Sequence, residues 1–239
     1  MPLEKPPRAV QSSMRARLIT LGEFFFRQRS WTPIPWILVL VLCRFHETST
    51  DLVTWVPGLS FLILGEGLRL WGVAVVGKES RTRGSGVARL VTQGPYAYVR
   101  NPLYLGNFFL TLGATFISEL LWMVPIAVVL YLIQYIPIVL WEEEVLAQRF
   151  GREYAAYCRH VPRWIPRWRR QLPTDSHVTY QWRASLWSER STFGALAGLL
   201  LVMVAKEDLA HLAKYLRKHY VMIDETASRH LVGKTSQCT

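Results

Sequence analysis

Long apolar segments alternate with short polar and basic ones along this chain. A bilayer core of about 30 Å needs about 20 apolar residues in a helix, and fewer if flanking side chains snorkel. The apolar segments are residues 31–45, 55–77, 103–117, 120–141 and 193–205. We therefore predict an all-α polytopic membrane protein with four or five transmembrane helices and cytosolic amphipathic helices.

Two details of this pattern refine the prediction. Only Ser118 and Glu119 separate the third and fourth segments, which predicts a tight helical hairpin with its turn at one membrane surface. The fifth segment, 193–205, is short for a span and would leave the basic tail outside. We expect it to span, because the charges around the first segments usually set the orientation, and a re-entrant segment is the alternative.

Charge orients the chain. The sequence has 28 Lys and Arg against 17 Asp and Glu, and the basic residues crowd into the N-terminal arm and into 78–100 and 142–190. The loop 46–54 carries Glu47 and Asp51 but no Lys or Arg. By the positive-inside rule, the N-terminus and both motif segments described below face the cytoplasm. A nucleic-acid binder would also be basic but would not need these apolar segments, so we expect none.

This pattern divides the chain into three parts. We expect a basic cytosolic arm over 1–30, a membrane core over 31–171 and a C-terminal extension over 172–239. The three cysteines are far apart and the six histidines show no metal-ligand spacing. No disulfide framework and no metal site are expected.

The first motif segment runs from Gln93 to Gly106 and contains the turn pairs Gly94-Pro95 and Asn101-Pro102. Pro102 suits the first turn of the third apolar helix, which makes Asn101 its N-cap. Arg100 and the open N–H groups of the helix then favour a carboxylate or a phosphate. The alternative is a capped membrane helix whose arginine snorkels to lipid phosphate.

The second motif segment starts with Glu142, Glu143 and Glu144, directly after the fourth apolar segment. A charge at this depth is costly without a partner. Aromatic residues at Phe150 and Tyr154 then recur with helical spacing, which predicts an amphipathic helix along the interface. An acidic first turn could bind an ammonium group, or it could only complement the dipole of its own helix.

Together the two segments offer sites for a carboxylate, an amine and a purine. These are the three polar parts of S-adenosyl-L-methionine. The motifs resemble those of the isoprenylcysteine carboxyl methyltransferase family and its phospholipid methyltransferase relatives, which read R-H-P-x-Y-x-G and E-E-x-x-L-x-x-x-F-G-x-x-Y-x-x-Y-x-x-x-V-P. The chain has Arg-Asn-Pro-Leu-Tyr-Leu-Gly at 100–106 and the second pattern from Glu142 to Pro162.

The resemblance implies an S-adenosylmethionine-dependent membrane methyltransferase acting on a lipophilic acceptor that enters from the bilayer. Tyr104 and Glu143 are the expected catalytic residues. The expected cofactor-binding residues are Gly94, Tyr96, Arg100, Asn101, Pro102, Tyr104, Glu142, Glu143, Tyr154 and Pro162. Its partners would be that acceptor and the membrane lipids, with no metal and no nucleic acid.

Two positions depart from the family pattern. Asn101 replaces the usual histidine, which keeps a hydrogen-bonding side chain but removes a possible charge. The eukaryotic prenylcysteine enzymes carry an arginine shortly before the glutamate pair, assigned to the substrate carboxylate, and residues 134–141 contain none. We therefore expect a prenylcysteine to be a poor acceptor and favour an amine-bearing or hydroxyl-bearing lipid.

Glu66 and Arg69 lie inside the second apolar segment at i, i+3 spacing. They are either a mutual ion pair between helices or part of a functional site. Two rival functions stay open at this point. One is a membrane reductase with a nicotinamide cofactor, and the other is a small transporter or assembly factor that uses these two residues as a polar track.

Overall fold

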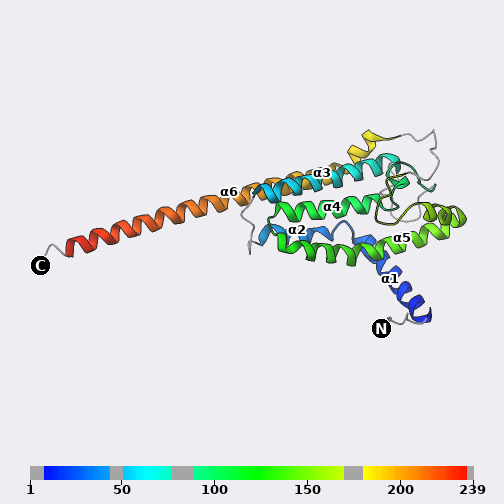
Figure 1. The fold of residues 1–239 in the computed structure, drawn as a ribbon, viewed down its shortest axis with the longest axis horizontal. Helices are drawn as coiled ribbons and strands as arrows, with labels where there is room; N and C mark the ends of the chain where they lie inside the picture. The colour runs from blue at the N-terminus through cyan, green and yellow to red at the C-terminus, as the bar shows by residue number, and fades with distance from the viewer. Residues whose placement is uncertain (1–7, 44–50, 77–88, 170–179, 236–239) are drawn as a thin grey trace. The chain divides into compact units, whose positions relative to one another are not determined.

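The structure is a computed structural model that describes residues 8–43, 51–76, 89–169 and 180–235. These residues are helical or irregular and contain no strand, which confirms the all-α prediction (Figure 1). The helices are α1 (Arg8–Gln28), α2 (Pro33–Leu42), α3 (Asp51–Val76), η2 (Gly94–Ala97), α4 (Pro102–Ile117), η3 (Leu121–Met123), α5 (Val124–His160) and α6 (Trp182–Thr235). Contacts divide the chain into two units, Met1–Gly194 and Ala195–Thr239.

Helices α3 and α4 lie side by side in the first unit (Figure 1). Glycines allow this close approach. A Cβ atom added to Gly65 would lie 2.7 Å from the carbonyl oxygen of Gly106, and one added to Gly113 would lie 2.8 Å from that of Gly58. Small residues at such positions let membrane helices pack backbone against backbone, so these glycines set the separation of α3 and α4.

The third and fourth apolar segments form the expected hairpin. Helix α4 ends at Ile117, and the chain reverses through Ser118 and through Glu119, whose φ is 62°. The single turn η3 then leads into α5. Tyr131 of α5 donates a hydrogen bond of 2.5 Å to the carbonyl oxygen of Tyr104 in α4, which ties the two arms of the hairpin together.

Helix α5 differs from the sequence-based expectation. It does not end with the apolar segment at Trp141 but continues through the three glutamates as one helix. The break comes at Gly151, where φ is 47° and ψ is −112°. This left-handed conformation is open to glycine at little cost. The second helical part, from Arg152 to His160, therefore starts in a new direction.

Helix α1 packs along α5. At their contact Gly22 lies against the carbonyl group of Pro137, where a larger residue would not fit. Phe26 of α1 packs on Trp141, with 4.7 Å between ring centroids. The basic N-terminal arm thus brings an apolar helix face to the core beside the glutamates.

The start of α6 packs on α3. Gln181 donates a backbone hydrogen bond of 2.8 Å to Ala74, and the Ser185 hydroxyl donates one of 2.8 Å to Leu70. The stretch Trp182–Lys206 is long and apolar enough to cross a membrane. This stretch contains the fifth apolar segment, 193–205. That segment alone is short for a membrane span, but the helix that contains it is long enough.

Within the part of the chain that the structure describes, three helices have the length and composition of membrane spans: Leu52–Val76, Leu121–His160 and Trp182–Lys206. Pro33–Leu42 and Pro102–Ile117 are shorter apolar helices. Integral membrane location follows from these helices. The loop 46–54, the basic stretch 78–88 and the boundary expected at 171/172 lie wholly or mostly outside the described residues.

The glycine contact between α3 and α4 can be tested with matched substitutions. Gly65→Ala should destabilise the protein by about 1–3 kcal/mol, because its new methyl group meets the backbone of α4. Gly67→Ala is the control, since its Cβ would have nothing within 4 Å. Thermal unfolding in detergent measures both. Equal unfolding temperatures for the two variants would contradict this role of Gly65.

Candidate cofactor and methyl-transfer site

The two motif segments meet where α4 begins and α5 ends. The Arg100 N–H donates a hydrogen bond of 2.9 Å to the carbonyl oxygen of Pro162. The Tyr157 hydroxyl donates one of 2.7 Å to the carbonyl oxygen of Tyr96. These two hydrogen bonds join the first motif segment to the second, across about 60 positions of sequence.

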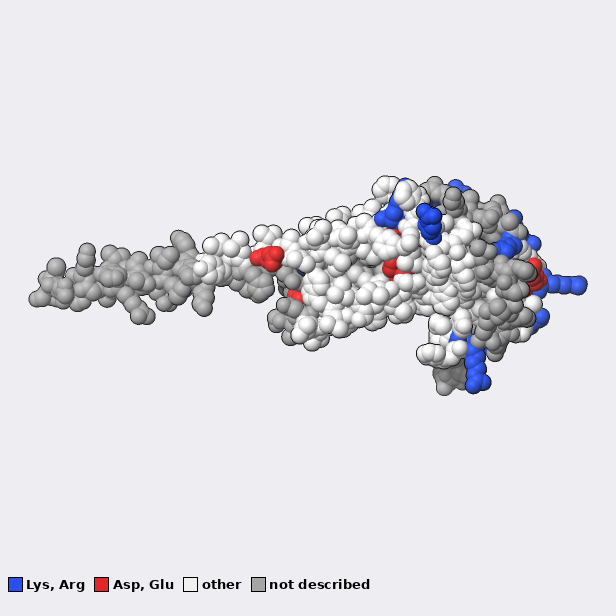
Figure 2. Space-filling model, turned by 90° about the horizontal axis from the view of Figure 1, so that it is seen from above, with Lys and Arg blue, Asp and Glu red and all other residues white. Residues whose placement is uncertain are grey.

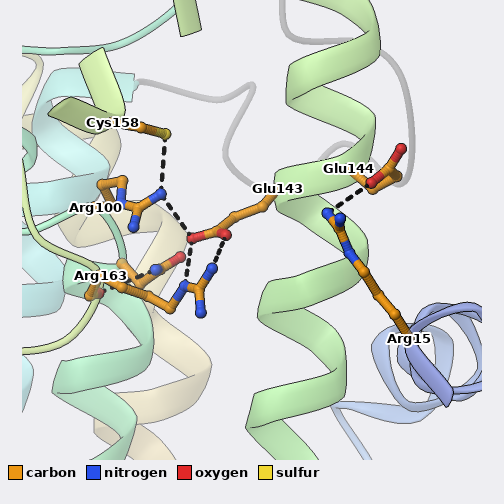
Figure 3. Close-up of polar contacts among 7 residues, drawn as sticks. Arg15, Arg100, Glu143, Glu144, Cys158 and Arg163 are labelled. Atoms are coloured by element: carbon orange, nitrogen blue, oxygen red, sulfur yellow. Dashed lines mark hydrogen bonds and ion pairs between the residues drawn. The ribbon is translucent and has the colours of Figure 1, made fainter. Parts of the chain in front are cut away.

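Glu143 is the centre of this junction (Figure 3). Its carboxylate points from α5 toward the first motif, where Arg100 pairs with it at 3.1 Å. Arg163 pairs with it through two hydrogen bonds, of 2.9 Å and 2.5 Å. The side chains of Glu143 and Arg100 are only 12% and 14% exposed, so this pairing is largely shielded from water. Two guanidiniums therefore share one carboxylate.

The surroundings of these guanidiniums fix them further. The hydrogen bonds that Arg163 donates to Glu143 raise the pKa of Arg163 above its usual value, so Arg163 stays charged. Arg100 also donates to the sulfur of Cys158 at 2.9 Å. Its Nε atom is buried and has no hydrogen-bond partner among the described residues. This donor is available to a ligand.

The three glutamates face different partners. Glu144 turns away from Glu143 and pairs with Arg15 of α1 at 3.1 Å (Figure 3). Glu142 lies on the third side, where the Tyr104 hydroxyl is within hydrogen-bonding reach of its carboxyl group. One helical turn thus directs its carboxylates to the first motif, to α1 and to Tyr104.

Asn101 and Pro102 occupy the positions that the sequence predicts, N-cap and first residue of α4. The Asn101 side chain does not cap the helix. Its amide instead donates a hydrogen bond of 3.1 Å to the carbonyl oxygen of Arg163. Asn101 therefore ties the two motif segments together, and its side chain accepts no hydrogen bond from the first N–H groups of α4.

Tyr104 is 7% exposed and belongs to an aromatic cluster. Its ring centroid lies 5.2 Å from that of Tyr135, which stacks on Tyr131 at 4.3 Å. On the side of α1, the Arg29 guanidinium lies 3.9 Å from the centroid of Phe26 and interacts electrostatically with Glu142 and Tyr104. Sequence reasoning missed Arg29, because nothing in its local pattern points to the glutamates.

Gly94 and Tyr96 line the first motif. Gly94 has a φ of 59°, and a Cβ there would lie 3.3 Å from the indole nitrogen of Trp71. Both backbone shape and space favour glycine at this turn. Burial, with a smaller contribution from Glu142, raises the pKa of Tyr96, so its hydroxyl stays neutral and can donate.

The aromatic residues of the second motif form a separate cluster. Tyr154 and Tyr157 are each 5% exposed and pack with Val161, with Phe150 and Leu146 beside them. This cluster adjoins the ionic junction, since Tyr154 interacts electrostatically with Glu143. Sequence reasoning selected Tyr154 and Pro162 as cofactor-binding residues. It named Arg163 only as a candidate for binding an acceptor carboxylate and did not pair it with Glu143.

The described Lys and Arg side chains gather toward one end of the first unit. Figure 2 shows most of them at the right, the end where α4 begins and α5 ends in Figure 1. Most of the remaining described surface in this view has no charged side chain. The candidate site therefore lies at the basic end of the membrane helices. Within the described residues, no group of His, Cys, Asp and Glu could hold a metal ion.

Known proteins share the region that contains this site. Residues 53–153 match the family described as phospholipid methyltransferase. The protein-S-isoprenylcysteine O-methyltransferase of Schizosaccharomyces pombe is 30% identical over 62% of this chain and 61% of its own length. Protein-S-isoprenylcysteine O-methyltransferase B of Arabidopsis thaliana is 32% identical over 46% of this chain and 57% of its own.

A third relative carries a different name. The nickel-cobalt-cadmium resistance protein NccN of Alcaligenes xylosoxydans xylosoxydans is 27% identical over 62% of this chain and 68% of its own length. No solved structure gives a significant match. The chain spans less than two thirds of the two isoprenylcysteine methyltransferases.

The family match covers α3, α4 and most of α5, and it includes both arms of the Arg100–Glu143 pair. Helices α1, α2 and α6 lie outside it. These similarities confirm the resemblance inferred from the two motifs. Over this region the chain is similar to integral membrane methyltransferases, both to the phospholipid methyltransferase family and to the protein-S-isoprenylcysteine O-methyltransferases.

Proposed function

We propose that this protein transfers a methyl group from S-adenosylmethionine to a lipophilic acceptor within the membrane. The observation that supports this most is the junction of the two motif segments through Arg100, Glu143 and Arg163. It places donors, carboxylates and aromatic faces together at the end of apolar helices. The similarity to membrane methyltransferases points to the same reaction.

Arg100 and Asn101 are proposed to bind the cofactor carboxylate. Two guanidiniums face one carboxylate at this junction, which leaves an excess of positive charge that suits an anion. The Nε atom of Arg100, buried without a hydrogen-bond partner among the described residues, is a donor for it. The N-terminus of α4, which begins at Pro102, adds its partial positive charge.

Glu142 is the better placed of the two predicted glutamates for the cofactor amine. Both oxygens of Glu143 already accept hydrogen bonds or ion pairs from guanidiniums. Glu142 has the Tyr104 hydroxyl within hydrogen-bonding reach, and Arg29 interacts with it electrostatically. Gly94, Tyr96, Tyr154 and Pro162 are proposed to surround the purine, which an aromatic and backbone wall can cover.

S-adenosylmethionine supplies an electrophilic methyl carbon on a sulfonium. The acceptor's nucleophile forms a bond to that carbon as the carbon–sulfur bond breaks, and the electron pair stays on sulfur in S-adenosylhomocysteine. This displacement needs alignment and exclusion of water more than strong acid-base groups. The buried Tyr104 and its aromatic neighbours provide that dry wall.

An amine or hydroxyl acceptor must also lose a proton. Glu143 is the carboxylate expected for this task, since Glu142 is assigned to the cofactor amine. Tyr104 is proposed to orient the nucleophile. The acceptor enters between helices whose outer faces are apolar, such as Ile133 and Ile136 of α5.

Cofactor binding is the first test. Isothermal titration of the detergent-purified full chain should show saturable binding of S-adenosylhomocysteine at submillimolar concentration and none of NADPH. The reason is that the junction provides separate sites for a carboxylate and an amine. Binding of NADPH without binding of S-adenosylhomocysteine would replace this proposal with the reductase alternative.

The glutamates can be separated by substitution. Glu142→Gln and Glu143→Gln should each weaken S-adenosylhomocysteine binding about tenfold to over a hundredfold, because each removes charge-assisted hydrogen bonds. Glu144→Gln is the matched control on the same turn, since Glu144 pairs with Arg15 away from the site. Calorimetry measures all three. Unchanged affinity in both Glu142 and Glu143 variants would remove these residues from the site.

The proposed orientation puts this site on the cytoplasmic side. In a chain without its native cysteines, Glu153→Cys should react with an impermeant thiol reagent only after the membrane is opened. Trp122→Cys, near the hairpin turn, should react in intact cells. Both positions are exposed in the structure. The opposite labelling pattern would reverse the topology.

A further inference from the structure

A second polar cluster lies between the membrane helices, around Arg69 of α3. Glu66 pairs with Arg69 at 3.5 Å, so the ion pair that was one of the two alternatives for these residues is present. A closer partner comes from α6, where Glu189 pairs with Arg69 at 2.5 Å across 120 residues. The side chain of Glu189 is only 2% exposed. Arg69 also donates a hydrogen bond to Asn107 of α4.

This cluster reaches the tyrosines of the proposed site. Asn107 lies one helical turn after Tyr104, and its amide donates a hydrogen bond of 3.1 Å to the hydroxyl of Tyr135. The Tyr135 ring in turn packs on Tyr104 at 5.2 Å between centroids. Asn107 therefore links the Arg69 guanidinium to Tyr135, which belongs to the aromatic cluster where the acceptor is proposed to react.

A buried guanidinium in that position would attract an acceptor with an anionic head group. Glu189 opposes this in two ways. Its carboxylate adds to the negative charge that Glu66 places beside Arg69, and it occupies one terminal nitrogen, while Asn107 occupies the other. Thr192 donates a hydrogen bond of 2.8 Å to the same oxygen of Glu189 and holds it toward Arg69.

We propose that Glu189 is a specificity-determining residue that acts through Arg69. By holding the guanidinium, it disfavours acceptors with a carboxylate and favours those with an amine or hydroxyl. The inference rests on the proposed methyl transfer and names its substrate class. Arg29, the guanidinium on the other side of the tyrosines, is faced by Glu142 and offers a carboxylate no better site.

Helix α6 gives this inference its own support. Glu189 lies outside the residues that match the methyltransferase family, 53–153. It is also a different side chain from those proposed to bind the cofactor. Its substitution should therefore change the choice of acceptor and leave cofactor affinity unaltered.

The test uses the full chain in lipid nanodiscs with methyl-labelled S-adenosylmethionine. Hexadecylamine and palmitic acid serve as acceptors of equal chain length, and both binding and methyl transfer are measured. The wild type should favour the amine. Glu189→Gln keeps the shape and removes the charge, and it should shift the acid-to-amine ratio toward the acid by about tenfold or more.

Three controls separate specificity from folding. Glu189→Asp retains the charge and should keep the wild-type ratio. Ser185→Ala removes a hydrogen bond of the same helix to Leu70 without changing charge, and it should also keep that ratio. S-adenosylhomocysteine affinity should be the same in all variants.

A wild type that prefers palmitic acid would overturn the inference, whether or not Glu189→Gln folds. An unshifted ratio in Glu189→Gln, or an equal shift in Ser185→Ala, would overturn it as well. The proposed function fails separately, if the wild type neither binds S-adenosylhomocysteine nor transfers a methyl group. The inference then falls with it.

Discussion

The arrangement of the site depends on one carboxylate that two guanidiniums share. Glu143 is fixed on α5, and both Arg100 and Arg163 come from irregular segments that no long helix constrains. Breaking a largely buried ion pair by removing one partner costs about 3–5 kcal/mol. The position of both arginines therefore follows from Glu143. A membrane helix in this way positions the irregular segments that carry the two arginines.

The same arrangement explains why the candidate site can lie beside a bilayer. Charges near hydrocarbon are tolerated when they are paired and covered. At the junction each charge has a partner, and aromatic residues such as Tyr154 and Tyr157 cover it. A ligand with both charges could exchange partners there without leaving a buried charge uncompensated. The apolar faces of the helices give a lipid tail access to the same place.

Much of the fold could be predicted from the sequence because its signals are local. The start of α4 at Pro102 and the hairpin at Ser118 follow from turn residues and apolar length. The end of α5 could not be predicted from a drop in hydropathy, since glutamates with partners continue a helix as well as leucines do. Only the backbone at Gly151 breaks it.

The candidate site was likewise predictable only in part, through the residues that local motifs indicate. The motif residues indicated Arg100 and Glu143, and the structure brings them together. The hydrogen bond of Asn101 to the Arg163 backbone has no local signal, because the partner is 62 residues away. The same holds for Glu189, which ordinary spacing rules cannot connect to Arg69. Contacts of this length depend on how helices pack.

The Arg69 pairs also bear on how the chain enters the membrane during synthesis. Helix α3 is made long before α6, so Arg69 must enter the bilayer more than a hundred residues before Glu189 exists. An arginine at the centre of a membrane helix costs about 2.5–3.5 kcal/mol to insert. Glu66, one turn earlier on the same helix, is already present to share that charge. Glu66, which is the nearer of the two glutamates in sequence, can thus serve as a temporary partner of Arg69 during biogenesis until α6 completes the cluster.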